Sequence, residues 1–287
     1  MRVTLAKGEM LLELDPCAGG AVSKLKHRDL DVLRPAPERV GPAFDALMYA
    51  SFPMVPFVGR IHRGQFSHNG QDVQLHANLP PEPHAIHGHG WQDVWKIEAQ
   101  TKTSATLSYN HTSDAWPWAY EARQMFRLGE DRLTIELSVT NRSDTPMPAG
   151  LGWHPYFYRA GATLVVPTTH VWTPDEETGD NAPSPVKIIG DLSRARIVQD
   201  LSLDTSFSVE PGAIEINWPT HAVIIKSDPI FSHATVFVPP GEDYFCAEPS
   251  TQAPNAINSE LPDDVTGLTW LKPGETLSGK IKLSVIH

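Results

Sequence analysis

The sequence predicts an all-β protein, built as a large antiparallel β-sandwich. Many short segments alternate between apolar and polar residues with a period of two. The 26 prolines and 20 glycines interrupt these segments at short intervals, and no apolar stripe of period 3.6 reaches helical length. Many short strands at close spacing are typical of two sheets packed face to face.

The clearest strand covers residues 132–141. The odd-numbered positions from Leu133 to Val139 are apolar and the even-numbered ones polar, which indicates a half-buried strand. Segment 123–128 precedes it across Gly129-Glu130-Asp131, a sequence that predicts a hairpin turn. Similar strands are predicted at residues 11–14, 94–99, 105–109, 163–166, 213–216, 222–225, 234–238 and 280–286. No linker or internal repeat divides the chain, so we expect one domain over residues 1–287.

Composition limits the classes of partner. The 23 basic and 34 acidic residues give a net charge of −11, and no Lys/Arg cluster occurs. Nucleic acids and anionic membranes need a positive footprint, so neither is expected as a partner. A small neutral ligand fits better. The sequence gives no indication of the oligomeric state.

Cysteine usage and the N-terminal residues bear on the compartment. Cys17 and Cys246 are far apart and form no CxxC pattern, so a disulfide framework is not expected and a reduced, cytoplasmic setting is the simplest interpretation. The N-terminus lacks the apolar stretch of a signal peptide, and no window approaches 18 apolar residues. We therefore expect a soluble protein.

Glu248 is the candidate general base. It follows the strand-like run at 234–238 and begins a segment in which Pro249 and Pro254 disfavour a helix, because each removes a backbone donor and fixes φ. The short polar side chains of this segment suit turns and hydroxyl-rich ligands. A carboxylate at a strand end, followed by a long polar loop, is a typical position for a general base. The alternative is a solvated loop glutamate.

A first histidine-bearing turn contains His87, His89 and Trp91. Glycines on both sides of His89 are expected to let the backbone pass close to a ligand, and Trp91 offers a flat face for a sugar ring. His87-x-His89 also resembles the start of some metal sites. No cysteine and no further His-plus-carboxylate set follows at short spacing, so no metal is expected.

A second turn places His154 between Trp153 and Pro155. Rings at 153, 156 and 157 form an apolar wall around the imidazole, and a neutral histidine in such a pocket can donate or accept a proton. Trp153 is expected to stack on the ligand, and the glycines at 150 and 152 to form a ligand shelf. The alternative is a core histidine bonded to the backbone.

Arg60 and Asp204 complete the candidate site. Arg60 follows Gly59 at the end of an apolar run, and the five N–H donors of its guanidinium group can bind a ligand. Arg63 is more typical of a surface arginine. Asp204 by itself is as compatible with turn capping as with ligand binding. The sequence has no GxSxG elbow, Gly-rich phosphate loop or dinucleotide fingerprint, so serine-hydrolase, kinase-like and nucleotide-dependent activities are unsupported.

Five motifs in chain order resemble those of the aldose 1-epimerase (galactose mutarotase) family. They are Gly59-Arg60-Ile61, Ile86-His87-Gly88, His154-Pro155-Tyr156-Phe157, Leu203-Asp204-Thr205-Ser206-Phe207 and the segment from Cys246 through Glu248 to Asn258. Gly64-Gln65-Phe66 with a small strand pair around Gly70, and Trp95, also match. The resemblance runs across nearly the whole chain, and its last motif is the most specific.

The resemblance implies a galactose mutarotase-like β-sandwich and interconversion of the α and β anomers of a free aldohexose. It implies Glu248 as the base, His154 as the acid, and Arg60, His87 and Asp204 as sugar-binding residues. This chemistry requires no cofactor. The family's Gly-Gly is Gly88-His89-Gly90 here, so a second imidazole is expected in the pocket.

The expected geometry places a carboxylate and an imidazole on opposite sides of one pyranose ring. Two other functions stay open. A hexose-6-phosphate 1-epimerase would need further cations around its dianionic substrate, for which Arg63 is the candidate. A non-catalytic sugar-binding module on the same fold would keep the aromatic residues and Arg60 but would not need the acid and base.

Overall fold

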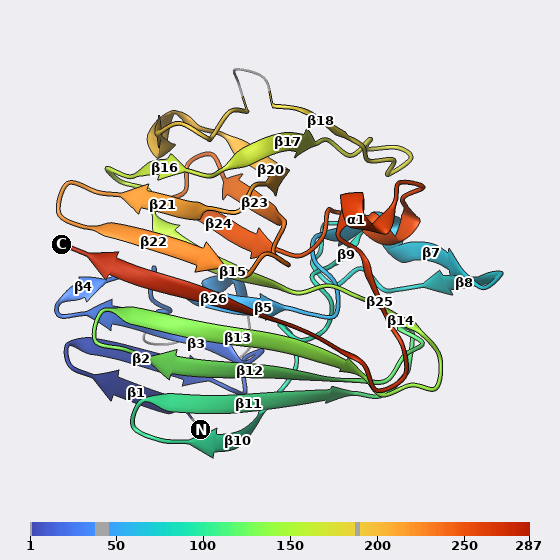
Figure 1. Cartoon of the computed structure of the whole chain (residues 1–287), viewed down its shortest axis with the longest axis horizontal. Helices are drawn as coiled ribbons and strands as arrows, with labels where there is room; N and C mark the ends of the chain where they lie inside the picture. The colour runs from blue at the N-terminus through green and yellow to red at the C-terminus, as the bar shows by residue number, and fades with distance from the viewer. Residues whose placement is uncertain (1, 38–45, 187–189) are drawn as a thin grey trace.

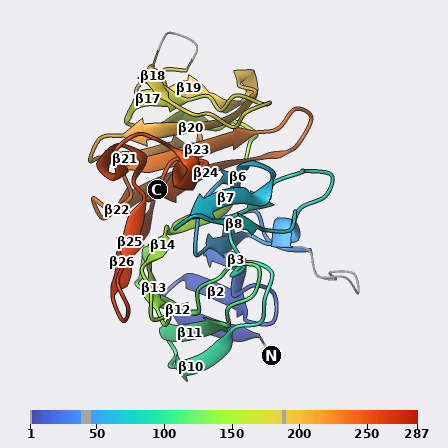
Figure 2. The ribbon, with the colours of Figure 1, turned by 90° about the vertical axis from the view of Figure 1, so that its right-hand side faces the viewer.

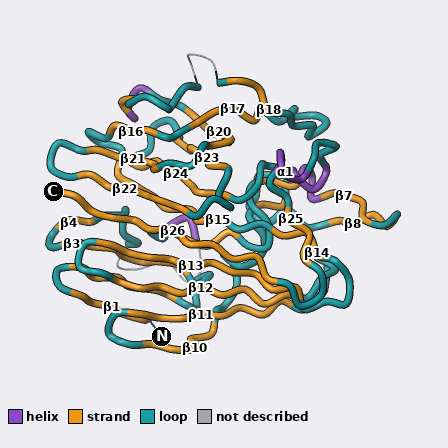
Figure 3. Tube along the Cα trace, viewed as in Figure 1, coloured by secondary structure: helices purple, strands orange, loops and turns teal. Residues whose placement is uncertain are grey.

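Two large antiparallel β-sheets dominate the computed structural model, which describes residues 2–37, 46–186 and 190–287 (Figure 1). Strands make up far more of the described backbone than helices do, as Figure 3 shows. The helical elements of the described residues are short: α1 (Asp263–Thr266), η1 (Ala46–Met48), η2 (His62–Gly64), η3 (Val198–Asp200) and η4 (Ala256–Asn258). The all-β expectation is confirmed.

The first sheet has eleven strands. They are β1 (Val3–Lys7), β2 (Met10–Asp15), β3 (Ala21–His27), β4 (Leu30–Asp31), β5 (Ser51–Met54), β15 (Gly152–Tyr158), β17 (Thr168–Trp172), β18 (Pro183–Pro185), β20 (Leu203–Val209), β23 (His233–Val238) and β24 (Tyr244–Ser250). Their order is β1-β2-β3-β5-β15-β24-β23-β20-β17-β18, with β4 beside β3. Strands from both ends of the chain therefore meet in the middle of this sheet.

The second sheet has nine strands. They are β10 (Lys96–Gln100), β11 (Ser104–His111), β12 (Tyr120–Leu128), β13 (Arg132–Asn141), β16 (Thr163–Val165), β19 (Arg196–Ile197), β21 (Ala213–Asn217), β22 (Ala222–Ser227) and β26 (Thr276–Ile286). The order is β10-β11-β12-β13-β26-β22-β21-β16-β19. β12 and β13 form the predicted hairpin, with Leu128 opposite Leu133. Every strand predicted from alternation is present, with ends that shift by up to four residues.

Three two-stranded ribbons lie beside the sheets. They are β6 (Arg60–Ile61) with β9 (Ala85–Ile86), β7 (Gln65–His68) with β8 (Gln71–Gln74), and β14 (Met147–Ala149) with β25 (Thr269–Leu271). The β7–β8 ribbon is the strand pair expected around Gly70. The β6–β9 ribbon has a functional consequence, because it joins the segment of Arg60 to the segment of His87 through the pairing of Arg60 with Ile86.

The hydrophobic core lies between the two sheets. Figure 2 shows the layers from the side, with β13, β22 and β26 in one and β2 and β3 in the other. Buried side chains from both layers form one cluster, among them Leu12 and Phe157 from the first sheet and Ile135 and Ile281 from the second. Burial of this apolar surface is the main stabilising contribution to the fold. A second, smaller cluster lies on the outer face of the eleven-stranded sheet and includes Phe52 and Tyr156.

Two expectations about local structure were wrong. His154 was expected in a turn and Glu248 at the start of a loop, but both lie within strands, β15 and β24. All residues of β24 except Tyr244 are buried, and all of β15 except Tyr158. Strands covered on both faces lose the alternation of apolar and polar residues that marks half-buried strands. Sequence alternation therefore could not reveal them.

The part of the chain that the structure describes has no helix of the length and apolarity needed to cross a membrane.

Candidate active site

Strand register aligns the candidate catalytic residues in one row. The pairings Gly152–Ser250 and Tyr156–Cys246 between β15 and β24 bring His154 and Glu248 side by side. Phe52 of β5 lies opposite His154, and Thr235 of β23 lies opposite Glu248. Because side chains alternate along a strand, this row points to the outer face of the eleven-stranded sheet, while Trp153 and Phe157 point into the core.

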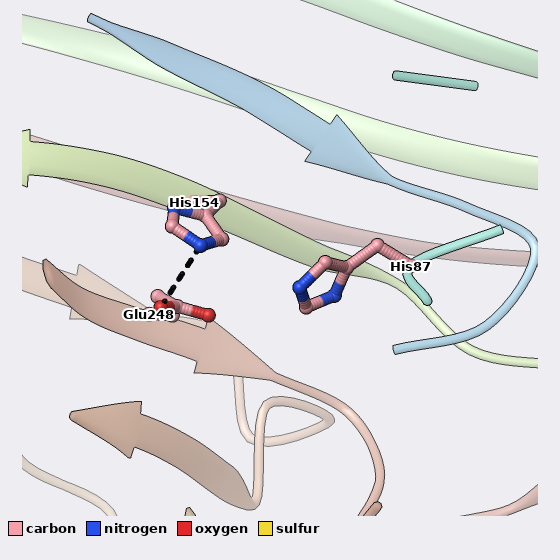
Figure 4. Close-up of side chains that lie close together, drawn as sticks. All are labelled: His87, His154 and Glu248. Atoms are coloured by element: carbon pink, nitrogen blue, oxygen red, sulfur yellow. Dashed lines mark ion pairs between the residues drawn. The ribbon is translucent and has the colours of Figure 1, made fainter. Parts of the chain in front are cut away.

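His154 and Glu248 form a buried pair in direct polar contact. The Nε2 atom of His154 lies 3.2 Å from Oε1 of Glu248, and the residues are 7% and 1% exposed (Figure 4). The imidazole is held between Phe52 and Tyr156, with ring centroids 4.4 and 4.9 Å away. Nδ1 of His154 and Oε2 of Glu248 are buried and accept or donate no hydrogen bond within the described residues. One nitrogen and one oxygen of the pair therefore have no hydrogen-bond partner among the described residues.

Burial shifts both members of the pair toward their uncharged forms. Desolvation raises the pKa of Glu248 well above its usual value, and the nearby Asp204 carboxylate adds to this effect. Desolvation lowers the pKa of His154 to about 3, although a backbone hydrogen bond opposes the shift. Both shifts favour the form of the pair in which His154 is neutral and Glu248 is protonated.

His87 faces the pair from the loop that follows β9. Its ring lies 5.4 Å from that of His154, nearly perpendicular to it, and Figure 4 shows it beside the pair. Nδ1 of His87 accepts the backbone N–H of Gly59 at 3.2 Å. Burial lowers the pKa of His87 well below its usual value, so the ring is neutral and its proton must be on Nε2. His87 is therefore a neutral donor.

Arg60 is held between two carboxylates at the rim. Its guanidinium donates to Asp204 Oδ2 at 2.9 Å and to the Glu82 carboxylate at 3.3 and 3.4 Å. All three side chains are between 36% and 45% exposed, so solvent weakens these ion pairs. This Arg60 cluster, which consists of Arg60, Glu82 and Asp204, holds the guanidinium group where it can still reach a ligand hydroxyl.

These residues surround one cavity of about 240 Å³. Its polar lining comes from His87, His154, Glu248 and the Arg60 cluster, and its apolar lining from aromatic side chains such as Tyr244. Small-molecule pockets usually measure roughly 300–1,000 Å³, so this cavity suits a single small ring. A wider depression of about 460 Å³ adjoins it and shares Arg60, Asp204, Ser206 and Pro254.

The sequence led us to expect Glu248 and His154 on opposite sides of one pyranose ring, and this expectation was wrong. The two groups touch at 3.2 Å, so no pyranose fits between them. They are neighbours on adjacent strands of one sheet, and cross-strand neighbours are only about 5 Å apart at Cβ. A ligand must therefore contact both from the same side.

Trp153 and His89 do not line the cavity. Trp153 is 1% exposed, lies in the core between the sheets and donates to Ser51 Oγ at 2.9 Å. It is adjacent to His154 on β15, so it must point to the opposite face. His89 turns away and stacks on His111, with ring centroids 4.5 Å apart. The expectations that Trp153 stacks on the ligand and that His89 enters the pocket are thus not supported.

Trp91 does line the cavity, but as part of its wall. It is 3% exposed, its ring stacks on Phe52 at 5.4 Å, and its indole N–H is shared between the carbonyls of Ile86 and Gly88. These contacts hold the loop that carries His87 against the wall of the cavity. Trp91 is therefore positioned to support this loop more than to offer an open face.

The glycines near the two histidines serve packing. A Cβ at Gly88 would lie 2.0 Å from the carbonyl oxygen of Val55, and one at Gly90 would lie 2.4 Å from a methyl of the same residue. A Cβ at Gly152 would lie 2.4 Å from the Met54 side chain. The close approach that needs glycine is thus to the protein itself, not to a ligand as expected.

Three site residues were not predicted. Glu82 pairs with Arg60, Phe52 stacks on His154, and Thr235 flanks Glu248. Each is distant in sequence from the residue that it contacts, so local pattern carries no signal for them. The position of Glu82 shortly before the Ile86-His87 motif is the one available indication.

The residue types that line this cavity would also be suitable as metal ligands. Ligand atoms of His87, His154 and Glu248 lie within 4.8 Å of one another, and two histidines with a glutamate make up some catalytic zinc sites. Metal-free chemistry in the cavity remains a prediction of the sequence.

Comparison of the sequence with known proteins assigns the chain to one family. Residues 1–284 match the family model of aldose 1-epimerases. The chain is 28% identical over 302 residues to the uncharacterized protein YphB of Escherichia coli strain K12, covering 98% of each chain.

Solved structures agree with this match. A crystal structure of a candidate aldose 1-epimerase from Escherichia coli K12 superposes with a TM-score of 0.88 at 28% identity, covering 99% of this chain and 98% of that one. A galactose mutarotase-like protein from Clostridium acetobutylicum superposes with a TM-score of 0.87 at 19% identity, covering 98% and 94%. The galactose mutarotase-like fold is therefore confirmed.

Replacing Glu248 by Gln should make stability less sensitive to pH. A carboxyl whose pKa rises on folding stabilises the native state fully below its unfolded pKa and loses that contribution as pH rises. Between pH 5 and 8, the free energy of unfolding of the wild type should fall relative to Glu248→Gln by on the order of 1 kcal/mol or more. Urea denaturation across this range measures the difference.

The exposed Glu215 supplies the matched control. Glu215→Gln should follow the wild-type pH dependence. Parallel curves for the wild type and Glu248→Gln would show that Glu248 ionises as in water.

Proposed function

The chain belongs to the aldose 1-epimerase family, and we propose that it is an isomerase that interconverts the α and β anomers of a free aldohexose. One observation carries this proposal: a buried carboxyl–imidazole pair, with a free atom on each member, lies in a cavity that suits one small ring. Anomerisation needs one proton acceptor and one proton donor close to the same carbon atom. The pair supplies both.

The proposed reaction uses the one proton that the pair carries. With this proton on His154, Glu248 is ionised and accepts the proton of the C1 hydroxyl, while His154 donates its proton to the ring oxygen. The C1–O5 bond breaks, and the open aldehyde forms with the proton of the pair now on Glu248. Rotation about C1–C2 by about half a turn and reversal of the two transfers close the other anomer. Each positioned proton-transfer group typically contributes roughly 10²–10⁴ in rate.

Contact between the acid and the base fits this chemistry. The C1 hydroxyl and the ring oxygen are both bonded to C1, so two adjacent protein groups can serve them from one edge of the sugar. His87 would donate from its Nε2 to a sugar oxygen, and Arg60 and Asp204 would bind hydroxyls. These contacts would hold the open form in place until it recloses.

Charge favours a free sugar over a sugar phosphate. Glu82, Asp204 and Glu248 line the cavity, and Arg60 is the one arginine or lysine among the described residues that line it. Arg63, the suggested phosphate ligand, is exposed and does not line the cavity. A dianion would enter a site whose one guanidinium already binds two carboxylates, and close like charges are repelled. Hexose-6-phosphate epimerisation is therefore the weaker alternative.

Substitution of either member of the pair should abolish most of the activity. Glu248→Gln and His154→Asn should each reduce the rate of anomer interconversion by at least about a hundredfold, because each removes one proton-transfer group. Polarimetry of freshly dissolved α-D-glucose and α-D-galactose measures this rate. The exposed Glu215→Gln and His76→Asn are the matched controls and should leave it unchanged.

Near-normal rates for a folded Glu248→Gln protein would remove the base assignment. Sugar binding by the wild type without any acceleration over buffer would instead identify a non-catalytic binding module.

The pH profile should report the shared proton. The active pair carries one proton, so activity is lost when it takes up a second at low pH and when it releases the first at high pH. Since the pKa of His154 is lowered to about 3 and that of Glu248 is raised, the acid limb should lie below 6.5 and the alkaline limb above 4.5. Measurement of kcat/KM from pH 3 to 10 tests this. A single rise near 6.5 would indicate a solvated imidazole and contradict the proposal.

Free hexoses should be the better substrates. We expect kcat/KM for α-D-glucose or α-D-galactose to exceed that for glucose 6-phosphate by at least about tenfold, because Arg60 already binds the Glu82 and Asp204 carboxylates and cannot neutralise a dianion as well. A polarimetric panel at constant ionic strength compares them. Faster turnover of the phosphate would reverse the ranking of the two functions.

A further inference from the structure

A second group of potential ligands lies outside the cavity. His89 follows the cavity-lining His87 by two residues, His111 ends β11, and Asp114 lies in the loop before β12. One ligand atom from each of the three lies within 4.8 Å of the other two. No third ligand lies at short spacing from His89 in the sequence, and the fold brings His111 and Asp114 to it from the hairpin of β11 and β12.

Hydrogen bonds fix the protonation of His111. The hydroxyl of Tyr109 donates its one proton to Asp93 Oδ2 at 2.7 Å, so it can only accept at Nδ1 of His111, 3.3 Å away. Nδ1 of His111 must then carry a proton, and in the neutral ring Nε2 has a lone pair. This Nε2 atom is buried and makes no hydrogen bond within the described structure, although Oδ1 of Asp114 lies 3.3 Å from it. A cation between this Nε2 atom and the Asp114 carboxylate would bind to both.

His89 adds a second nitrogen to the same place. Its Nδ1 lies 3.3 Å from the hydroxyl of Tyr120, which leaves Nε2 for another partner. Histidines that bind metals usually have their second ring nitrogen hydrogen-bonded in this way, because the bond fixes the ring and its tautomer. Both imidazoles therefore have the outer hydrogen bonds of metal ligands.

We propose that His89, His111 and Asp114 form a binding site for a divalent transition-metal ion such as Zn²⁺. Two histidines and one carboxylate are a frequent zinc ligand set, with water in the fourth position. The side chain of Asp114 is 62% exposed, so an ion can reach the site from solvent and retain a water ligand.

Binding requires a small rearrangement. The two imidazoles are stacked nearly parallel, 5° apart, with centroids 4.5 Å from each other. Two nitrogen ligands of a tetrahedral zinc ion lie roughly 3.4 Å apart, given Zn–N distances of about 2.0–2.1 Å. The rings must therefore tilt toward each other. The ion would then tie the loop of His87 to the end of β11.

Binding of Zn²⁺ or Co²⁺ to the untagged, chelator-treated protein tests the proposal. Calorimetry with Zn²⁺ should give a site of one ion per chain, and Co²⁺ should give the absorption bands of a tetrahedral complex. Asp114→Asn should weaken binding by at least about tenfold and His111→Phe by at least about a hundredfold. Asp114→Asn is the safer variant for folding, because an asparagine oxygen can still accept the Trp116 N–H that Asp114 Oδ1 accepts at 2.9 Å.

Two controls separate this site from other carboxylates and from the cavity. Asp144→Asn alters another exposed loop aspartate and should bind as the wild type does. Glu248→Gln should also retain binding. If Glu248→Gln loses the ion while Asp114→Asn retains it, the ion is bound by the cavity residues and the proposal is wrong. Absence of binding at millimolar Zn²⁺, or equal affinity in Asp114→Asn and the wild type, would also overturn it.

Discussion

The direct contact between His154 and Glu248 is the interaction on which the candidate site depends. Both side chains are buried at the middle of the eleven-stranded sheet, where water cannot stabilise their charges. Such a pair is stable when its members share one proton and remain neutral overall, and the pKa shifts of both residues point in this direction. The same burial leaves a carboxyl oxygen of Glu248 and a ring nitrogen of His154 without a hydrogen-bond partner among the described residues.

The sheet sets the geometry of this pair more rigidly than a loop could. Adjacent strands hold the two residues in register, and the flanking rings of Phe52 and Tyr156 limit rotation of the imidazole. The loops contribute the residues that complete the cavity, His87 and the Arg60 cluster, and the β6–β9 ribbon joins these two segments. Rigid strands thus supply the proposed proton-transfer groups, whereas loops supply the groups that would bind the hydroxyls of a sugar.

The loop that carries His87 also connects the cavity to the proposed metal site. Trp91 closes this loop onto the cavity wall, while His89 points away toward His111. Residues two positions apart therefore face different environments, one the proposed sugar site and the other the proposed metal site. An ion at the second site would restrict the loop at the first without touching the sugar.

The sequence by itself determined the fold class and identified His154 and Glu248 as the candidate acid–base pair. Half-exposed strands such as β13 carry their period in the sequence, and the motifs around His154 and Glu248 resemble those of one family across the chain. Tertiary structure decided which way each side chain points and what it touches. The core position of Trp153, the direct contact of acid and base, and the pairing of Arg60 with Glu82 all depend on strand register and long-range packing. Contacts of this kind join residues far apart in the chain, so no local pattern of residues contains them.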